Sequence, residues 1–324
     1  MKKGIIFLIT IIILFSVFIG IISNKKERKT SSDKIEVVAT LFPQYDFVRQ
    51  IGKDKVEVSL LLTPGTETHT YEPTPQDIVN VNNADLFIYT GKYMEPWSDK
   101  IASSIDSDTK ILDVSKNINL INEEDFEEEH ANSEEHSKEE HNKTESHTHE
   151  YDPHIWLDPQ NAIGMVNNIT QELCSIDPQN EEFYKNNAQD YISKLHDLDE
   201  DIKLTIKNSK NNKIAFGGTF AYAYFVKKYN LEYVSAYDSC GEDSEPSVSK
   251  VKEVIDYIKK NNIHVIFYQE LSAGKIADTI ASETNSTKLI FHTIHNATQE
   301  ELNNGATYLS LMNKNLENLK KALN

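Results

Sequence analysis

The alternation of short apolar runs with helix-like stretches constrains the fold of this chain more than any other feature. Eight runs rich in β-branched and aromatic residues read as strands: Ile35–Leu41, Val56–Leu62, Leu86–Tyr89, Ile111–Val114, Ile214–Phe216, Leu231–Ala236, Val265–Tyr268 and Leu289–Phe291. Helical spacing of apolar residues occurs between them, over Pro75–Asn82, Glu95–Ile105, Ala221–Lys228, Val248–Lys260, Lys275–Thr284 and Gln299–Leu323. This alternation predicts parallel sheets covered by helices, and its two blocks predict two lobes.

A longer helical pattern separates the two blocks. Asp177 and Pro178 offer an N-cap and a first helical position. Apolar residues then follow in steps of three or four, at Tyr184, Ala188, Tyr191, Leu195, Leu198 and Ile202. This spacing predicts a helix of about 30 residues, or about 45 Å. We therefore expect an α/β fold with lobes over 34–175 and 210–324, joined by one long rigid helix over 176–209.

The N-terminal segment predicts export. Two lysines precede an almost unbroken apolar run, Ile5–Ile22, and a basic run follows at 25–29. This pattern is typical of an export signal, and the run is long enough to anchor the chain in a membrane if it is not cleaved. No cysteine follows the run, so the lipid-modified cysteine of bacterial lipoproteins is absent. We expect residues 1–30 to be a signal or anchor and the remainder to be extracytoplasmic, either membrane-associated or secreted.

Composition narrows the functions that the chain can have. The 33 Lys and Arg against 51 Asp and Glu give a formal charge of −18, which argues against nucleic acid as a partner. Only two cysteines occur, so neither a disulfide framework nor a cysteine-rich zinc site is available. A metal site in this chain must use histidine and carboxylate ligands.

Five of the 11 histidines lie in one acidic segment. Residues 123–150 hold these histidines among many Asp and Glu residues, and Phe126 is their only large apolar residue. Such a composition cannot bury a core, so we expect a disordered insert over 122–150. Weak and labile capture of metal ions is the interpretation that we prefer over a simple solvated acidic loop.

Four of the remaining histidines are candidate ligands. His69 lies in a loop just past a strand, and His154 follows the acidic insert. His292 directly follows the last predicted strand, and His295 comes three residues later. Loops beyond the carboxyl ends of parallel strands form the ligand crevice of α/β proteins. The other two histidines are expected on the surface, at His196 and His264.

Four local motifs carry a family resemblance. They are Gly65 to Pro75 with the run His-Thr-Tyr-Glu-Pro, Tyr89 to Trp97, Asp152 to Pro159 with the run Asp-Pro-His-Ile-Trp-Leu-Asp-Pro, and Glu242 to Ser247. In this combination the chain resembles the zinc/manganese-type solute-binding proteins of ABC importers over residues 35–324. The resemblance implies two pseudo-symmetric lobes with a metal between them and partnership with a permease and an ATPase. It also implies a monomer that binds cargo and is not an enzyme.

The resemblance implies a metal site that departs from the family pattern. His69 matches the first family histidine and His154 the second, whereas Thr219 stands where the third histidine is usual. His292 occupies the position of the usual fourth ligand, an Asp or Glu, and His295 is close behind. We expect a site of His69, His154 and His292, with His295 as a further ligand. A carboxylate in or behind this set could come from Glu245 or Glu270.

Imidazole-rich coordination without sulfur favours Zn²⁺ as the bound cargo, whereas Mn²⁺ prefers more carboxylate. Manganese or another metal in the same role stays open as an alternative. Two other classes of protein are weighed against this one: a surface protein for metal buffering or adhesion, and a zinc hydrolase. The chain has neither a His-Glu-x-x-His helix nor a Gly-x-Ser-x-Gly turn, so the sequence does not favour a hydrolase.

Overall fold

The computed structural model describes residues 34–66, 68, 71–105, 108–126, 150–237 and 246–324. The chain divides into two units, Met1–Lys34 and Ile35–Asn324. The predicted export segment and its apolar run lie outside the described residues. Within the described ranges, no helix has the length and apolar character needed to cross a membrane. The bounds predicted for the two lobes and for the linking helix stay predictions, because all three segments lie within the second unit.

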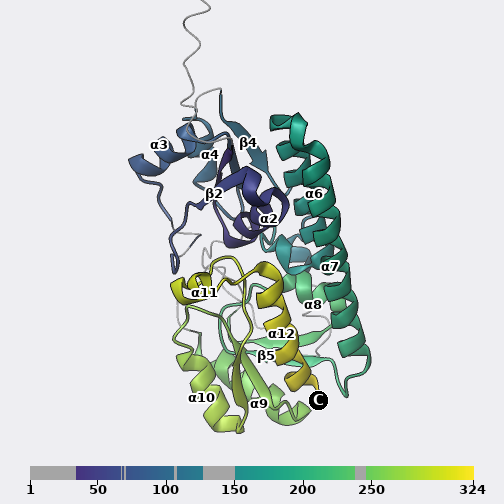
Figure 1. The fold of residues 1–324 in the computed structure, drawn as a ribbon. Helices are drawn as coiled ribbons and strands as arrows, with labels where there is room; N and C mark the ends of the chain where they lie inside the picture. Colours follow the sequence, from purple (N-terminus) through teal and green to yellow (C-terminus); the bar gives the residue numbers. More distant parts are fainter. Residues whose placement is uncertain (1–33, 67, 69–70, 106–107, 127–149, 238–245) are drawn as a thin grey trace, which may run out of the picture. The chain divides into compact units, whose positions relative to one another are not determined.

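The first half of the second unit contains a parallel four-stranded sheet in the order β2-β1-β3-β4 (Figure 1). Its strands are β1 (Ile35–Ala39), β2 (Val56–Leu60), β3 (Leu86–Tyr89) and β4 (Lys110–Asp113). Helices α2 (Phe42–Gly52), α3 (Pro75–Asn83) and α4 (Ser98–Ala102) connect them, with a 3₁₀ turn η1 (Lys53–Lys55) before β2. The central strands β1 and β3 are mostly buried, which explains their near-continuous apolar sequences.

The second half repeats this architecture. Its parallel sheet has the order β6-β5-β7-β8. The strands are β5 (Lys213–Phe216), β6 (Glu232–Ser235), β7 (Val265–Tyr268) and β8 (Thr287–Ile290), and helices α8 (Ala223–Tyr229), α9 (Val248–Asn261) and α10 (Lys275–Thr284) connect them. The two sheets share one strand order, so the predicted pseudo-symmetric α/β fold is confirmed.

The helices between the sheets differ in detail from the prediction. A 3₁₀ turn η2 (Ile155–Leu157) leads into α6 (Pro159–Ile176), and a second turn η3 (Pro178–Asn180) leads into α7 (Glu181–Lys207). The predicted start at Asp177 is wrong, because Asp177 ends α6 and its carboxylate accepts from the Tyr184 hydroxyl at 2.7 Å. The 27-residue α7 packs on α6, α2 and α12, so it contacts helices of both halves of the chain (Figure 1).

The C-terminal helix predicted over Gln299–Leu323 is two helices, α11 (Gln299–Asn303) and α12 (Tyr308–Leu323). Gly305 between them has φ +72°, a conformation that glycine adopts without a steric penalty. Thr307 then caps α12 by accepting a hydrogen bond from the backbone N–H of Ser310. The break directs α12 back along α7, where it packs.

The base of the acidic insert is ordered, contrary to expectation. Residues 123–126 are helical, and Phe126 is only 5% exposed because its ring stacks on Phe220 and Tyr233. Asn122 and Tyr151 form an antiparallel bridge that closes the two ends of the insert. The expectation of disorder is therefore wrong for residues 123–126, while residues 127–149 lie outside the described residues.

One hydrophobic core runs through both halves of the second unit. At its centre, the indole N–H of Trp156 donates to the carbonyl of Thr293 at 2.8 Å, and the hydroxyl of Tyr308 donates to the carbonyl of Trp156 at 2.6 Å. The backbone N–H of Tyr308 donates to the buried carboxylate of Asp46 at 2.8 Å. Burial of each such aromatic ring stabilises the fold by about 2–3 kcal/mol. These bonds connect α2, η2 and α12 with the loop after β8.

Candidate metal centre

The predicted ligands come from loops that follow strands or precede helices. His154 lies directly before η2, while His292 and His295 follow β8. All three are buried, with exposures of 1%, 3% and 8%. His69 and Glu245 lie outside the described residues. His196 and His264 are exposed, as their sequence context indicates.

His154 is oriented by the residue two places before it. One carboxylate oxygen of Asp152, Oδ1, accepts from the backbone N–H of His154 at 2.7 Å and from its ring Nδ1 at 3.1 Å. Tyr224 fixes this arrangement by donating its hydroxyl to the carbonyl of Asp152 at 2.9 Å. A carboxylate on Nδ1 makes Nε2 the nitrogen that carries the lone pair, as in many histidine ligands of zinc.

His295 is oriented by a relay of two groups. Glu270 is 7% exposed and accepts from the backbone N–H of Thr293 at 2.8 Å and from its hydroxyl. Since the single hydroxyl hydrogen of Thr293 goes to the carboxylate, Thr293 Oγ1 accepts from Nδ1 of His295. The relay therefore places the proton of His295 on Nδ1 and its lone pair on Nε2.

His292 is in the opposite tautomer. Its Nδ1 accepts from the backbone N–H of Ile294 at 2.8 Å, so the neutral ring carries its proton on Nε2. Nε2 lies 3.5 Å from Oε2 of Glu301. The interaction with His292, aided by donors of Thr298, lowers the pKa of Glu301 to about 2 although burial opposes this. Asn315 holds the backbone of His292 by two hydrogen bonds, of 2.6 and 2.8 Å.

The backbone beside these histidines is strained. Ile294, between His292 and His295, has φ +65°, and Leu271, next to Glu270, has φ +62°. A left-handed conformation is unfavourable for a branched side chain and persists only where the surrounding contacts enforce it. Such residues are concentrated at functional sites. Strain on both segments supports a site around Glu270 and the loop after β8.

Several expectations about the site are not tested by these contacts. Within the ranges that the structure describes, no three His, Cys, Asp or Glu side chains are grouped closely enough to hold a metal. Thr219, at the position of the usual third histidine, accepts from the side-chain amide of Gln269 at its carbonyl, at 2.9 Å, and at its hydroxyl. The ligand set of His69, His154, His292 and His295 thus stays a prediction.

Sequence reasoning missed the residues that orient the histidines. Asp152 could have been found, because it precedes His154 by two residues in a quoted motif. Thr293, Asn315 and Glu301 gave no local signal, since they act through contacts that only the fold creates.

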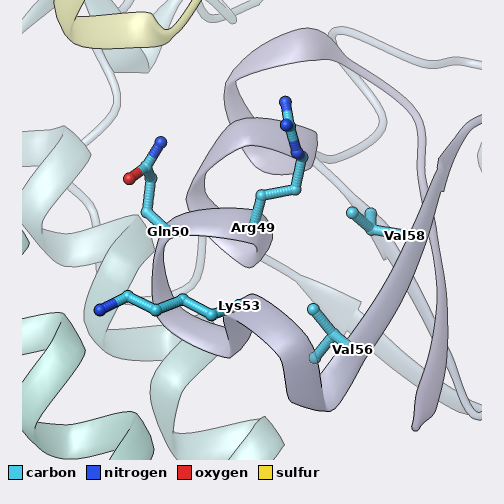
Figure 2. A pocket seen from close by; sticks show the side chains of 5 residues that line it. All are labelled: Arg49, Gln50, Lys53, Val56 and Val58. Carbon is cyan, nitrogen blue, oxygen red and sulfur yellow. The ribbon is translucent and has the colours of Figure 1, made fainter.

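A pocket elsewhere does not offer a metal site. A cavity of about 320 Å³ opens beside α2 and β2 and is lined by Arg49, Gln50, Lys53, Val56 and Val58 (Figure 2). None of these side chains is a donor that zinc prefers. Arg49 instead lies over the ring of Tyr45, and Lys53 donates to Asn187 at 2.6 Å.

Two parallel sheets share one strand order, and buried imidazoles lie in the loop before η2 and in the loop after β8. This is the architecture of the two-lobed, metal-type solute-binding proteins. A family model described as "Zinc-uptake complex component A periplasmic", ZnuA, matches residues 37–322. The chain belongs to this family, whose members are components of zinc uptake systems and not enzymes.

Characterised relatives agree with this assignment. The high-affinity zinc uptake system protein ZnuA of Bacillus subtilis (strain 168) is 38% identical over 98% of this chain and 97% of its own length. The zinc-binding protein AdcA of Streptococcus pyogenes serotype M3 is 32% identical over 99% of this chain. The match covers 61% of the length of AdcA.

Solved structures share the fold. The metal-dependent lipoprotein YcdH from Bacillus subtilis has a TM-score of 0.74 and 34% identity, covering 90% of this chain and 99% of YcdH. The Zn(II)-bound ZnuA-like domain of Streptococcus pneumoniae AdcA has a TM-score of 0.73 and 28% identity, covering 90% of this chain and 99% of that domain. The fold class predicted from the sequence therefore agrees with experimentally determined relatives.

Proposed function

We propose that this protein binds zinc through His69, His154 and His295. The observation that carries this proposal is the tautomer of His154 and His295. Each ring donates a hydrogen bond from Nδ1 to a neighbouring oxygen, so its lone pair is on Nε2. Three imidazoles with water or a carboxylate in the fourth place bind zinc tightly. Glu245 and Glu270 are the carboxylates that the sequence offers for that place.

His292 receives a different role in this proposal. The family resemblance placed it at the matched ligand position, but its Nδ1 accepts from the backbone N–H of Ile294, and its buried Nε2 lies 3.5 Å from Oε2 of Glu301 without forming a hydrogen bond. To bind zinc through Nε2, the ring would have to carry its proton on Nδ1 and so lose the hydrogen bond from Ile294. We infer that His292 stabilises the loop that presents His295.

Zinc fits this donor set better than manganese, which prefers carboxylate ligands. The relatives with the zinc uptake and zinc-binding names given above support the same cargo. Raw affinity alone would also admit Cu²⁺ or Ni²⁺, which bind nitrogen donors well, so the metal supply matters.

We propose further that the protein is exported, stays outside the cytoplasm and delivers zinc to an ABC permease with its ATPase. The apolar run Ile5–Ile22 supports export or anchoring, and the family description names a periplasmic uptake component. In this role the protein acts as a monomer with one cargo ion. Loss of high-affinity zinc uptake on deletion of its gene, restored by the intact gene, would support delivery.

A competition titration with a fluorescent zinc chelator tests the binding site. The purified wild-type protein should bind one Zn²⁺ tightly, and His154→Ala should lower the affinity by about 100-fold or more, since each ligand of a zinc site contributes several kcal/mol. The exposed His196→Ala variant is the matched control and should bind as the wild type does. Equal affinities of the two variants would contradict the proposed site.

A further inference from the structure

Asn296 connects two loops that are far apart in the sequence. It follows His295 directly and is 1% exposed. Its side-chain amide donates to the carbonyl of Thr63 at 3.3 Å and to the carbonyl of Thr66 at 3.0 Å. Its Oδ1 accepts from the backbone N–H of Ala297 at 2.7 Å. Both amide hydrogens and the oxygen are thus engaged, which no other uncharged side chain of this length can match.

The two carbonyls that Asn296 binds belong to one turn. The backbone N–H of Thr66 donates to the carbonyl of Thr63 at 3.1 Å, and their hydroxyl oxygens are 2.7 Å apart. This turn lies in the loop after β2, three residues before His69 in the sequence. Asn296 therefore holds the start of the segment that carries the first predicted ligand.

The end of that segment is held from its own half of the chain. The indole N–H of Trp97 donates to the carbonyl of Thr68 at 3.3 Å. Tyr71, on the other side of His69 in the sequence, packs its ring against Trp97 with centroids 5.2 Å apart and donates its hydroxyl to Asp77 at 2.6 Å. Only the start of the segment, at the Thr63–Thr66 turn, is bonded by these contacts to the loop after β8.

The backbone next to Asn296 reinforces the same connection. The N–H of Phe42, at the start of α2, donates to the carbonyl of His295 at 3.1 Å. Ile294 keeps its strained conformation in the same loop. A loop that is strained and also bonded across the molecule holds its geometry only while the contacts persist.

We propose that Asn296 is a positioning residue that fastens the Thr63–Thr66 turn to the His295 loop, so that release of zinc requires these bonds to break. This inference rests on the proposed zinc function, because it assigns His69 and His295 to one site. We call the bonds from Asn296 to Thr63 and Thr66 the clasp. The clasp ties the two ligand-bearing loops together without contributing a ligand.

The clasp predicts a change in zinc dissociation. Asn296→Asp keeps the shape of the side chain but replaces two donors by an acceptor that faces two carbonyls. We expect the dissociation rate of Zn²⁺, measured by stopped-flow transfer to a fluorescent chelator, to rise about tenfold or more. The association rate should change by no more than about twofold, as interface changes act mainly on dissociation.

Asn313→Asp is the matched control. Asn313 is exposed on α12, and its amide donates to Leu309 within the same helix. The control adds the same charge without touching either loop. A merely structural defect in Asn296→Asp would reduce the amplitude of binding in proportion to the unfolded fraction and leave the dissociation rate unchanged. Asn296→Ala, which adds no charge, gives the same test if the aspartate variant does not fold.

The outcomes separate this inference from the zinc function itself. Faster zinc release from Asn296→Asp or Asn296→Ala than from Asn313→Asp supports the clasp. Equal release rates overturn it while zinc binding by the wild type stands. Absence of tight zinc binding by the wild type would instead overturn the proposed function.

Discussion

Each sheet places a buried glutamate after its third strand in chain order, and the two glutamates are held in similar ways. Glu95 follows β3; its Oε1 lies 2.5 Å from the hydroxyl oxygen of Thr40, and its Oε2 accepts from the backbone N–H of Thr90 at 3.1 Å. Glu270 follows β7 and accepts from the hydroxyl and the backbone N–H of Thr293. Their exposures are 0% and 7%. We call the groups bonded to each buried glutamate its cage: Thr40 and Thr90 around Glu95, and Thr293 around Glu270. The same kind of cage thus occurs in both halves of the chain.

The difference lies in what surrounds the cages. Nδ1 of His292 lies 3.4 Å from Glu270 and Nδ1 of His295 lies 4.0 Å from it. Glu95 is bonded to hydroxyl and backbone groups, and burial raises its pKa to about 8 although the hydrogen bond with Thr40 opposes this. One cage therefore holds a neutral acid at neutral pH, while the other orients the His295 ring through Thr293.

Hydrogen-bond geometry supports a protonated Glu95 independently. Thr40 has one hydroxyl hydrogen, yet its Oγ1 lies 2.9 Å from Oε1 of Gln44 and 2.5 Å from Oε1 of Glu95. If Glu95 carries a proton, it donates to Thr40, and Thr40 donates to Gln44, so every group is satisfied. The comparison teaches that a buried glutamate is not by itself evidence of a metal site; its neighbours decide its role.

The largest expected effect tests the neutral cage. Between the ordinary pKa of 4.5 and about 8, folded Glu95 keeps a proton that the unfolded chain has lost. The free energy of unfolding contributed by this group therefore falls as pH rises through that window, by up to about 1.4 kcal/mol per pH unit. Glu95→Gln removes this dependence on pH. In urea unfolding, the free energy of unfolding of the variant should therefore rise relative to that of the wild type from pH 5 to pH 8.

The exposed Glu57→Gln is the control for this experiment, and its stability should keep a constant difference from that of the wild type across the same pH range. Parallel curves for Glu95→Gln and the wild type would show that Glu95 ionises normally, and the contrast between the two cages would be lost.

The second effect tests the cage around Glu270. In Glu270→Gln the amide donates to Thr293, so Thr293 turns its hydroxyl hydrogen toward Nδ1 of His295 and the ring must carry its proton on Nε2. Changes to groups behind a ligand typically lower metal affinity by about 10–100-fold. Competition titration should show this loss in Glu270→Gln. The exposed Glu283→Gln is the control and should keep the zinc affinity of the wild type. Equal affinities of the two variants would contradict the relay.

The smallest effect concerns the backbone beside the cages. After β3 the left-handed residue is Gly91, with φ +123°, whereas after β7 it is Leu271, with φ +62° and 47% exposure. Asparagine adopts this conformation more readily than leucine, so Leu271→Asn should stabilise the protein by up to about 1 kcal/mol. The same change at Leu204, also exposed but inside α7, should destabilise it by about 0.5 kcal/mol. Thermal unfolding of Leu271→Asn and Leu204→Asn measures both changes in stability. Destabilisation in both variants would argue against strain at Leu271.

The sequence predicted the strands well because parallel strands buried on both faces are short, continuous apolar runs, as Leu86–Tyr89 and Val265–Tyr268 show. It misplaced the start of α7, because Asp177 and Pro178 carry the same signals whether they open an α-helix or end the previous one. It also could not predict the tautomers of His292 and His295. Each tautomer depends on a hydrogen bond, with Ile294 for His292 and with Thr293 for His295, and these bonds form only when the loop takes up its strained conformation.

The central claim is that His295, and not His292, presents its Nε2 lone pair to zinc. Measurement of the zinc affinity of His295→Ala and His292→Ala side by side, by competition with one chelator, tests it most directly. The account predicts a loss of about 100-fold or more for His295→Ala, which removes a ligand. It predicts about tenfold for His292→Ala, which removes the partner of Glu301. A greater loss in His292→Ala would contradict the account and return the ligand role to His292.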